Sequence, residues 1–311
     1  MADEVRSVLH FLRHVFPIVL PWVEERLQAA WRRVGFDPAM LADPLARPRL
    51  VFGDWVGGDR DGHPLVTDEV TAATLATFRR SALELLDERL TDLAAGASLS
   101  AFRQAPPPDL ARWIEARARA LGGAGAEALG RNPDEPWRQA ANLLRAGLPP
   151  AEAEVPERAY ADAGELAADL LRLRKSLERV GAERLAQTDI DPVLRLVRTF
   201  GFHLARLDIR QNSAFHDRAL AQLLELAGVD GASDFPSWDE PRRRELLARE
   251  LNLARPFAHP RDETGPEAAA VLGCYRVLVD EVERHGAAGL GALIVSMTRS
   301  PAGAVRKILA G

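Results

Sequence analysis

Residues 198–220 read RTFGFHLARLDIRQNSAFHDRAL, a short alternating run that leads into a helix. The run at 203–209 predicts a strand, and successive side chains on a strand point to opposite faces, so Asp208 and Arg210 should share one face. Arg210 then stands at the carboxyl end of the strand, just before a helix starting near Ser213. In barrels and open α/β sheets, ligand groups collect at that end of the strands.

An arginine in this place suits a phosphate or a carboxylate, because its planar guanidinium donates parallel, charge-assisted hydrogen bonds. The N-terminus of the following helix, with Ser213 as its cap, would add to an anion site. A second interpretation is equally open from the residues alone. In it, Asp208 and Arg210 form only an internal ion pair.

The other dense polar stretch is GDWVGGDRDGHPLVT at residues 53–67. Its glycines permit positive φ and close backbone approach, and its acidic–basic–acidic run packs three charges into a turn. From composition alone, the favoured interpretation is a strand-to-helix turn in which the neighbouring aspartates neutralise Arg60. It has neither the Lys-Ser/Thr of a P-loop nor the GxGxxG spacing of a dinucleotide fold. The candidate site residues of this loop are Gly57, Gly58, Asp59, Arg60, Asp61 and Gly62.

Most of the chain shows the three–four apolar spacing of amphipathic helices. Pro17 and Pro21 should kink or divide the first helix, and Thr67 is a good N-cap for the second. Exposed connections are expected near 94–108 and 147–160. The predicted helices cover 3–33, 67–94, 109–121, 135–146, 163–181, 191–200, 214–227, 239–252 and 265–285.

Only three short runs predict strands, at 50–56, 203–209 and 291–296. Three isolated strands do not make a stable sheet unless other strands join them, so the pattern indicates an incomplete barrel. The predicted fold class is therefore mainly α with a few short strands.

Composition excludes several classes of protein. The net charge of -5 argues against a nucleic-acid binder, and no apolar run is long enough to span a membrane. The single cysteine, Cys274, excludes a disulfide framework, suits a reducing cytoplasm and is most simply a small buried apolar residue. His10 and His14 share a helix face, but no carboxylate ligand set accompanies them, so no metal site is expected there.

Four segments together resemble the phosphoenolpyruvate carboxylase family. FGDWVGGDRDGHPLVT is similar to the family signature FGxWxGGDRDGNPxVT, and FGFHLARLDIRQNSAFHDRAL to FGxxLxxLDIRQxSxxH. LARELNLARPF (247–257) is similar to LxxELxxxRP, and LIVSMTRSP (293–301) to xxISMxxxxSD. The matches occur in family order, and the resemblance covers about residues 3–300.

The resemblance implies an eight-stranded TIM-like barrel surrounded by helices, assembled as a cytoplasmic homotetramer. It implies a carboxy-lyase that uses Mg2+ or Mn2+ to convert phosphoenolpyruvate and bicarbonate to oxaloacetate and phosphate, an anaplerotic carbon fixation that feeds the tricarboxylic acid cycle. By this resemblance, Arg210 holds the substrate phosphate, and Asp208 and Gln211 orient or flank it. The loop at 57–62 would border the active-site mouth or a subunit contact.

The departures from the family pattern are equally informative. His63 stands where the family usually has asparagine, and Asn212 where it usually has an acidic residue. The sequence holds no TAHPTE with its catalytic histidine, no FHGRGG loop, no YSDSxKDAG segment and no metal-ligand glutamate segment. We therefore expect a single incomplete domain over residues 1–311, without retained catalytic or metal residues and inactive by itself. The alternative is a non-catalytic helical module for binding or assembly, derived from the same family.

Overall fold

The structure, a computed structural model, describes residues 2–61, 63, 65–153, 155–252, 258–259 and 262–298. It is mainly helical with a three-stranded sheet, and it divides into two compact units. The sheet unit comprises Met1–Ala2, Gly53–Thr74 and Leu207–Gly311, and the helical unit comprises Asp3–Phe52 and Leu75–Arg206. A compact unit is not necessarily an independent domain, so the single incomplete domain stays a prediction. No described helix has both the length and the apolarity to cross a membrane.

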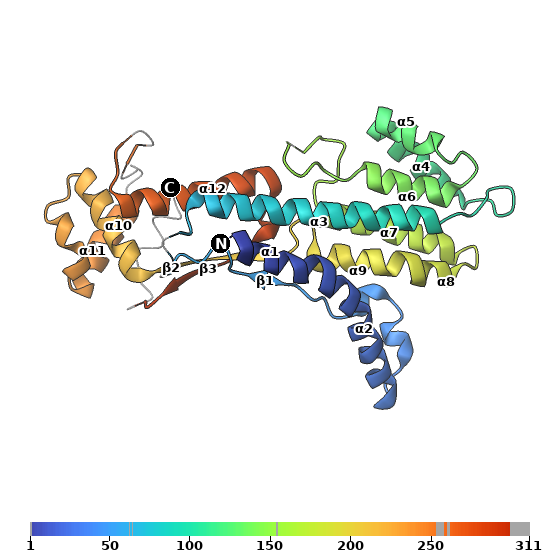
Figure 1. The fold of residues 1–311 in the computed structure, drawn as a ribbon, viewed down its shortest axis with the longest axis horizontal. Helices are drawn as coiled ribbons and strands as arrows, with labels where there is room; N and C mark the ends of the chain where they lie inside the picture. Colours follow the sequence, from blue (N-terminus) through green and yellow to red (C-terminus); the bar gives the residue numbers. More distant parts are fainter. Residues whose placement is uncertain are drawn as a thin grey trace. The chain divides into compact units, whose positions relative to one another are not determined.

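Helices make up nearly all of the regular structure of the helical unit (Figure 1). The predicted helices are confirmed to within a few residues, whereas α5 and α8 were not predicted. The elements are α1 (Ala2–His10), η1 (Phe11–Val15), α2 (Phe16–Arg33), η2 (Pro38–Leu41), η3 (Pro44–Ala46), α3 (Asp68–Gly96, which begins in the sheet unit), α4 (Pro108–Leu121), α5 (Gly123–Gly130), α6 (Pro136–Ala146), α7 (Ala163–Glu178), α8 (Glu183–Leu185), η4 (Ala186–Ile190) and α9 (Asp191–Phe200).

The first predicted helix is divided, as its prolines indicate. A π-helical turn, η1, separates α1 from α2, and Pro17 is the second residue of α2. Proline has no N–H to donate and its ring clashes with the preceding turn, which favours a wider turn at this point. Pro21 lies inside α2.

The core of the helical unit follows from the apolar faces of its helices. In α6, Trp137, Leu143 and Leu144 are fully buried, and the indole N–H of Trp137 donates to Ser176 of α7 at 3.0 Å. This bond satisfies the only polar atom of the largest buried side chain. The exposed connection predicted at 94–108 is confirmed from residue 98 onward, where the side chains are exposed or half-buried. Its first residues belong to the end of α3.

The sheet has the strand order β1 (Gly53–Asp54), β2 (Arg206–Asn212), β3 (Leu290–Ser296). The parallel pair β2–β3 places Arg210 opposite Ile294. The prediction for β3 is confirmed, whereas β2 begins three residues later than expected and β1 is much shorter. Among the described residues the strands pair with one another, and a TIM-like barrel is not seen.

Two turns account for the displaced strands. After α9, the N–H groups of His203 and Leu204 both donate to Phe200 O, and Leu204 has a φ of 62°, so the chain is still turning where the strand was expected. After β1, the N–H groups of Gly58 and Asp59 both donate to Trp55 O at 2.9 Å, which ends the strand early.

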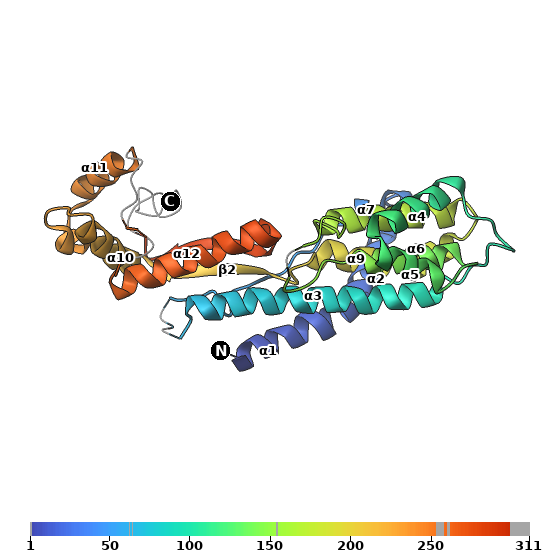
Figure 2. The same ribbon diagram turned by 90° about the horizontal axis from the view of Figure 1, so that it is seen from above.

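The parallel crossover from β2 to β3 contains the remaining helices of the sheet unit (Figure 2). These are α10 (Ser213–Leu226), η5 (Ala232–Ser237), α11 (Glu240–Leu251), α12 (Pro266–His285) and η6 (Ala287–Gly289). Leu223 of α10 packs with Val271 and Tyr275 of α12, and Leu293 of β3 lies against this cluster. Cys274 is buried, as predicted, and burial raises the pKa of its thiol.

Candidate anion-binding site

The candidate site is centred on Arg210 of β2. As strand alternation predicts, Asp208 and Arg210 lie on the more exposed face of β2, and Leu207 and Ile209 are buried on the other. Arg210 Nη2 lies 3.2 Å from Asp208 Oδ2, so the ion pair is present. The Arg210 side chain is still 30% exposed, which leaves its guanidinium accessible to a ligand.

Asp208 is itself held from the next strand. Its Oδ1 accepts a hydrogen bond from the backbone N–H of Ala292 at 2.9 Å, while Oδ2 faces Arg210. A Cβ at position 291 would lie 2.3 Å from Asp208 Oδ1, so only glycine allows this approach. The carboxylate therefore orients Arg210 from a fixed position.

The glycine-rich loop lies against Arg210. Arg210 N donates to Gly58 O at 3.0 Å, and the N–H of Arg60 donates to Arg210 O at 2.8 Å. A Cβ at Gly58 would lie 2.1 Å from Asp208 O, and Gly57 has a φ of +89°. Glycine is thus required at both positions for the loop to pair with β2. Gly62 lies outside the described residues.

Arg60 was expected to be neutralised by its neighbouring aspartates, and this prediction is wrong. Its Nη2 donates to Thr71 Oγ1 at 2.7 Å and to Thr67 O at 3.2 Å, at the start of α3. Thr71 in turn donates to Gly57 O at 2.7 Å. The hydroxyl of Thr71 and the carbonyl of Thr67 thus take up Nη2 of Arg60, and the aspartates face other groups.

Those aspartates take part in the surroundings of Arg210. Asp59 Oδ2 lies 3.8 Å from Arg210 Nη1, beyond hydrogen-bond distance, and its Oδ1 accepts from the N–H of Asp61 at 3.0 Å. Asp61 accepts a hydrogen bond from the hydroxyl of Ser296 in β3. The loop is therefore tied to both β2 and β3.

Two contributors were not predicted from the sequence. The Arg210 guanidinium lies over the indole of Trp55, whose side chain is otherwise exposed. Asp54 in β1 is only 7% exposed, and burial raises the pKa of its carboxyl, with the charge of Asp208 adding to the effect. The sequence did hold a signal for Asp54. It is the only charged residue in the run 50–56, which was expected to be a strand.

The helix after β2 begins as predicted, but its cap differs. Asn212 is the N-cap, because its Oδ1 accepts from the N–H of Ala214 at 2.8 Å. The expectation of Ser213 as cap is wrong; Ser213 is the first helical residue, and its hydroxyl donates to Met297 O at 2.7 Å. Gln211 lies on the buried face of β2, and its Oε1 accepts from the N–H of Asn212. Any support it provides acts through the start of α10.

A divalent metal is not accommodated by the residues described. In that part of the chain, no three histidine, cysteine, aspartate or glutamate side chains converge as a ligand set. The carboxylates of Asp59, Asp61 and Asp208 are directed to the Arg210 guanidinium and to backbone or hydroxyl donors. Mg2+ and Mn2+ need several converging oxygen ligands, so this site does not fit them.

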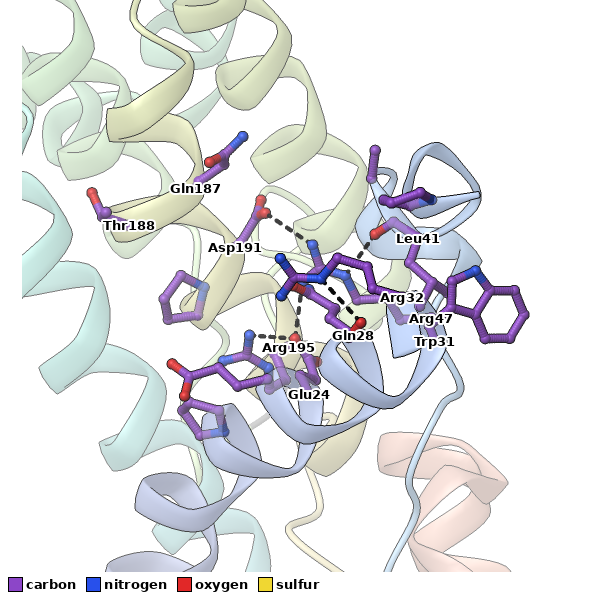
Figure 3. A pocket seen from close by; sticks show the side chains of 15 residues that line it. Glu24, Gln28, Trp31, Arg32, Leu41, Arg47, Gln187, Thr188, Asp191 and Arg195 are labelled. Carbon is purple, nitrogen blue, oxygen red and sulfur yellow. Dashed lines mark hydrogen bonds and ion pairs between the residues drawn. The ribbon is translucent and has the colours of Figure 1, made fainter. Parts of the chain in front are cut away.

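A second concave region lies in the helical unit, with a volume of about 610 Å³ (Figure 3). Its central carboxylate, Glu24, accepts hydrogen bonds from Arg47 and Arg195. Burial would raise the pKa of Glu24, but the hydrogen bonds and charges of Arg195 and Arg47 outweigh it and lower the pKa. The two arginines are used in internal pairing, so no ligand is assigned to this cavity.

The glycine loop, Asp208 and the partly exposed Arg210 define the class as a mainly helical chain with a small parallel sheet that carries a candidate anion site. The sequence matches the profile of the family described as phosphoenolpyruvate carboxylase over residues 1–309, and the chain belongs to that family.

Its relatives agree with this assignment and are longer. The chain is 34% identical over 314 residues to a phosphoenolpyruvate carboxylase of Mycolicibacterium paratuberculosis, 36% over 313 residues to one of Azoarcus sp. and 35% over 309 residues to one of Rhodothermus marinus. Each alignment covers 96% of this chain and 32% of the relative. The family is thus one of carboxy-lyases, and the chain spans about a third of the length of these relatives.

Proposed function

We propose that Arg210 holds the phosphate of phosphoenolpyruvate for the carboxylation that gives oxaloacetate and phosphate from phosphoenolpyruvate and bicarbonate. The observation that carries this proposal is that the Arg210 guanidinium is both held in place and accessible. It is oriented by Asp208 and Trp55, yet 30% of the side chain is exposed. An oriented, accessible guanidinium suits bidentate binding of a phosphate.

The ion pair and the anion site are compatible with each other. Asp59 is too far from Arg210 Nη1 for a hydrogen bond, so an incoming phosphate oxygen would replace a weak contact there. Asp208 also accepts a hydrogen bond from the N–H of Ala292 in β3, which keeps its carboxylate in place. Nη2 of Arg210 can therefore share its N–H groups between Asp208 and the phosphate. A phosphate can accept two parallel, charge-assisted hydrogen bonds from the guanidinium, which Asp59 at 3.8 Å does not.

We further propose that this chain holds substrate and does not complete the reaction. The family's catalytic-histidine motif and metal-ligand segments have no counterpart in these 311 residues. A cytoplasmic location, assembly into a homotetramer and a place for the 57–62 loop at the active-site mouth belong to the same proposal. Mixing the chain with phosphoenolpyruvate, bicarbonate and Mg2+ is expected to give no oxaloacetate, and measurable turnover would refute this part.

The test of the binding role is calorimetric titration of phosphoenolpyruvate into the chain and into Arg210→Lys. Lysine keeps the charge but loses the planar fork, so affinity should fall about tenfold or more. The matched control is Arg218→Lys, because Arg218 lies on α10 in the same unit and pairs at the surface with Glu267. No binding by the unaltered chain, or equal binding by Arg210→Lys, would contradict the proposal.

The second candidate function is a non-catalytic assembly module. It is favoured by large apolar side chains left exposed along α2 and the residues after it, including Trp22, Phe36 and Met40. Exposed patches of this kind mark interaction surfaces. Association of the chain in sedimentation velocity, together with no affinity for phosphoenolpyruvate, would favour this function over the first.

A further inference from the structure

Four buried side-chain atoms in β1, β2 and the glycine loop lack a hydrogen-bond partner among the described residues. They are Asp54 Oδ2, which is an acceptor, Arg210 Nε, which is a donor, and Arg60 Nη1 and His63 Nδ1 in the loop. Strand β1, which carries Asp54, lies next to β2, which carries Arg210. The charge of Arg210 lowers the pKa of Asp54 against the larger effect of burial, and Oδ2 and Nε themselves are not hydrogen-bonded to each other.

Leaving Asp54 Oδ2 and Arg210 Nε unsatisfied would be costly. A buried donor or acceptor without a partner has lost its hydrogen bonds to water and gained none in exchange. Because Arg210 Nε donates and Asp54 Oδ2 accepts, one water between them satisfies both atoms. A link between Asp54 Oδ2 and Arg210 Nε is therefore the simplest arrangement in which neither remains unsatisfied.

Asp54 also fixes the other partner of Arg210. The backbone N–H groups of Trp55 and Val56 face the Asp54 carboxylate and lower its pKa against the effect of burial. This holds the start of the turn that presents the Trp55 indole to the guanidinium. Asp54 can thus position Arg210 in two ways. It supports the turn that carries the Trp55 ring, and it lies on the Nε side of the guanidinium.

We propose that Asp54 is a positioning residue for Arg210, linked to its Nε through one water, so that the terminal nitrogens Nη1 and Nη2 face the ligand. Asp59 and Asp208 occupy the terminal nitrogens, where a phosphate would compete with them. Asp54 holds the opposite edge and does not compete. The consequence for ligand affinity rests on the proposed function, whereas the link itself does not.

The link is tested without ligand by nuclear magnetic resonance of the Arg210 Nε–H group, assigned with Arg210→Lys. In the unaltered chain this proton should be protected from exchange with solvent. Asp54→Asn removes the charge and can turn an N–H toward Nε, so exchange should become about tenfold faster. The matched control is Asp217→Asn, since Asp217 is equally buried in the same unit and pairs with Arg243 at 3.0 Å.

The control should leave the Arg210 signal unchanged and move that of Arg243. Unchanged exchange and chemical shift at Arg210 in Asp54→Asn would overturn the proposal, as would an equal response to both variants. If Asp54→Asn does not fold, a pH titration of the unaltered chain decides. The charged groups facing Asp54 are Asp208 and Arg210. The Arg210 Nε signal should follow the protonation of Asp54, monitored at its carboxyl carbon, and a flat response overturns the link.

A calorimetric arm separates this inference from the proposed function. Asp54→Asn should weaken phosphoenolpyruvate binding about tenfold, while Asp217→Asn should not. If the unaltered chain binds no phosphoenolpyruvate, the proposed function fails and the resonance experiment still decides the link. If it binds and Asp54→Asn binds equally well, the positioning role fails while the role of Arg210 stands.

Discussion

The Arg210 guanidinium lies over the ring of Trp55, with Cζ 4.8 Å from the ring centroid. Trp55 belongs to the loop after β1 and Arg210 to β2, so this contact joins the two polar segments of the sequence. An aromatic face under a guanidinium holds its plane and leaves its edges for hydrogen bonds.

Trp55→Leu should weaken phosphoenolpyruvate binding two- to fivefold, since an exposed cation–π contact contributes about 0.5–1 kcal/mol. Titration calorimetry measures the change. Trp238→Leu is the control, because Trp238 stacks on Arg242 in the same unit. Equal affinity in the unaltered chain and Trp55→Leu would show that the ring does not help to hold the ligand.

Gly58→Ala should destabilise the chain by about 2–3 kcal/mol in urea unfolding. The added Cβ would meet the backbone O of Asp208 at 2.1 Å, and backbone cannot move aside as a flexible side chain does. Gly130→Ala is the control, since nothing lies within 4 Å of a Cβ built there. A small effect at both positions would mean that the loop does not pair with β2 as described.

Thr71→Val should cost about 1–3 kcal/mol of unfolding free energy, because it leaves Arg60 and Gly57 O without the hydroxyl that joins them. Thr71 is fully buried, so water does not replace the lost group. Thr91→Val removes a hydroxyl bonded to Asp87 O on the exposed side of the same helix, and it should change stability by no more than about 0.5 kcal/mol.

Stability should fall in acid because of His203. Burial, with the charges of Arg206, Arg49 and Arg79, lowers the pKa of His203 from 6.5 to about 4. The unfolded chain therefore takes up this proton first as the pH falls. The stabilisation is complete above pH 6.5 and is lost between pH 6.5 and 4, to the extent of about 3 kcal/mol.

The measurement is urea unfolding at a series of pH values for the unaltered chain and His203→Gln. The variant should show a shallower loss of stability over that window. His10→Gln, at an exposed position on α1, should keep the slope of the unaltered chain. Identical slopes in all three chains would remove His203 as the cause.

The helices could be predicted because their signals are local. The Thr67 cap is confirmed by the bond from Val70 N to Thr67 Oγ1 at 3.3 Å, and α9 occupies the predicted 191–200. The strands were less predictable, because their ends depend on turns and on pairing with distant segments. The left-handed φ of Leu204 shifts the start of β2 toward the C-terminus. This φ could not be predicted, because leucine rarely adopts it.

Sequence alone determined that Asp208 and Arg210 share a face, since strand alternation needs no partner. Only the tertiary structure decided what that face meets. Because the glycine loop pairs with β2, the ring of Trp55 and the carboxylate of Asp59 lie next to the Arg210 guanidinium. The same pairing places the Arg60 guanidinium within hydrogen-bond distance of the Thr71 hydroxyl. Charge pattern along a chain does not fix these partners, because the backbone path decides which groups come within hydrogen-bond distance.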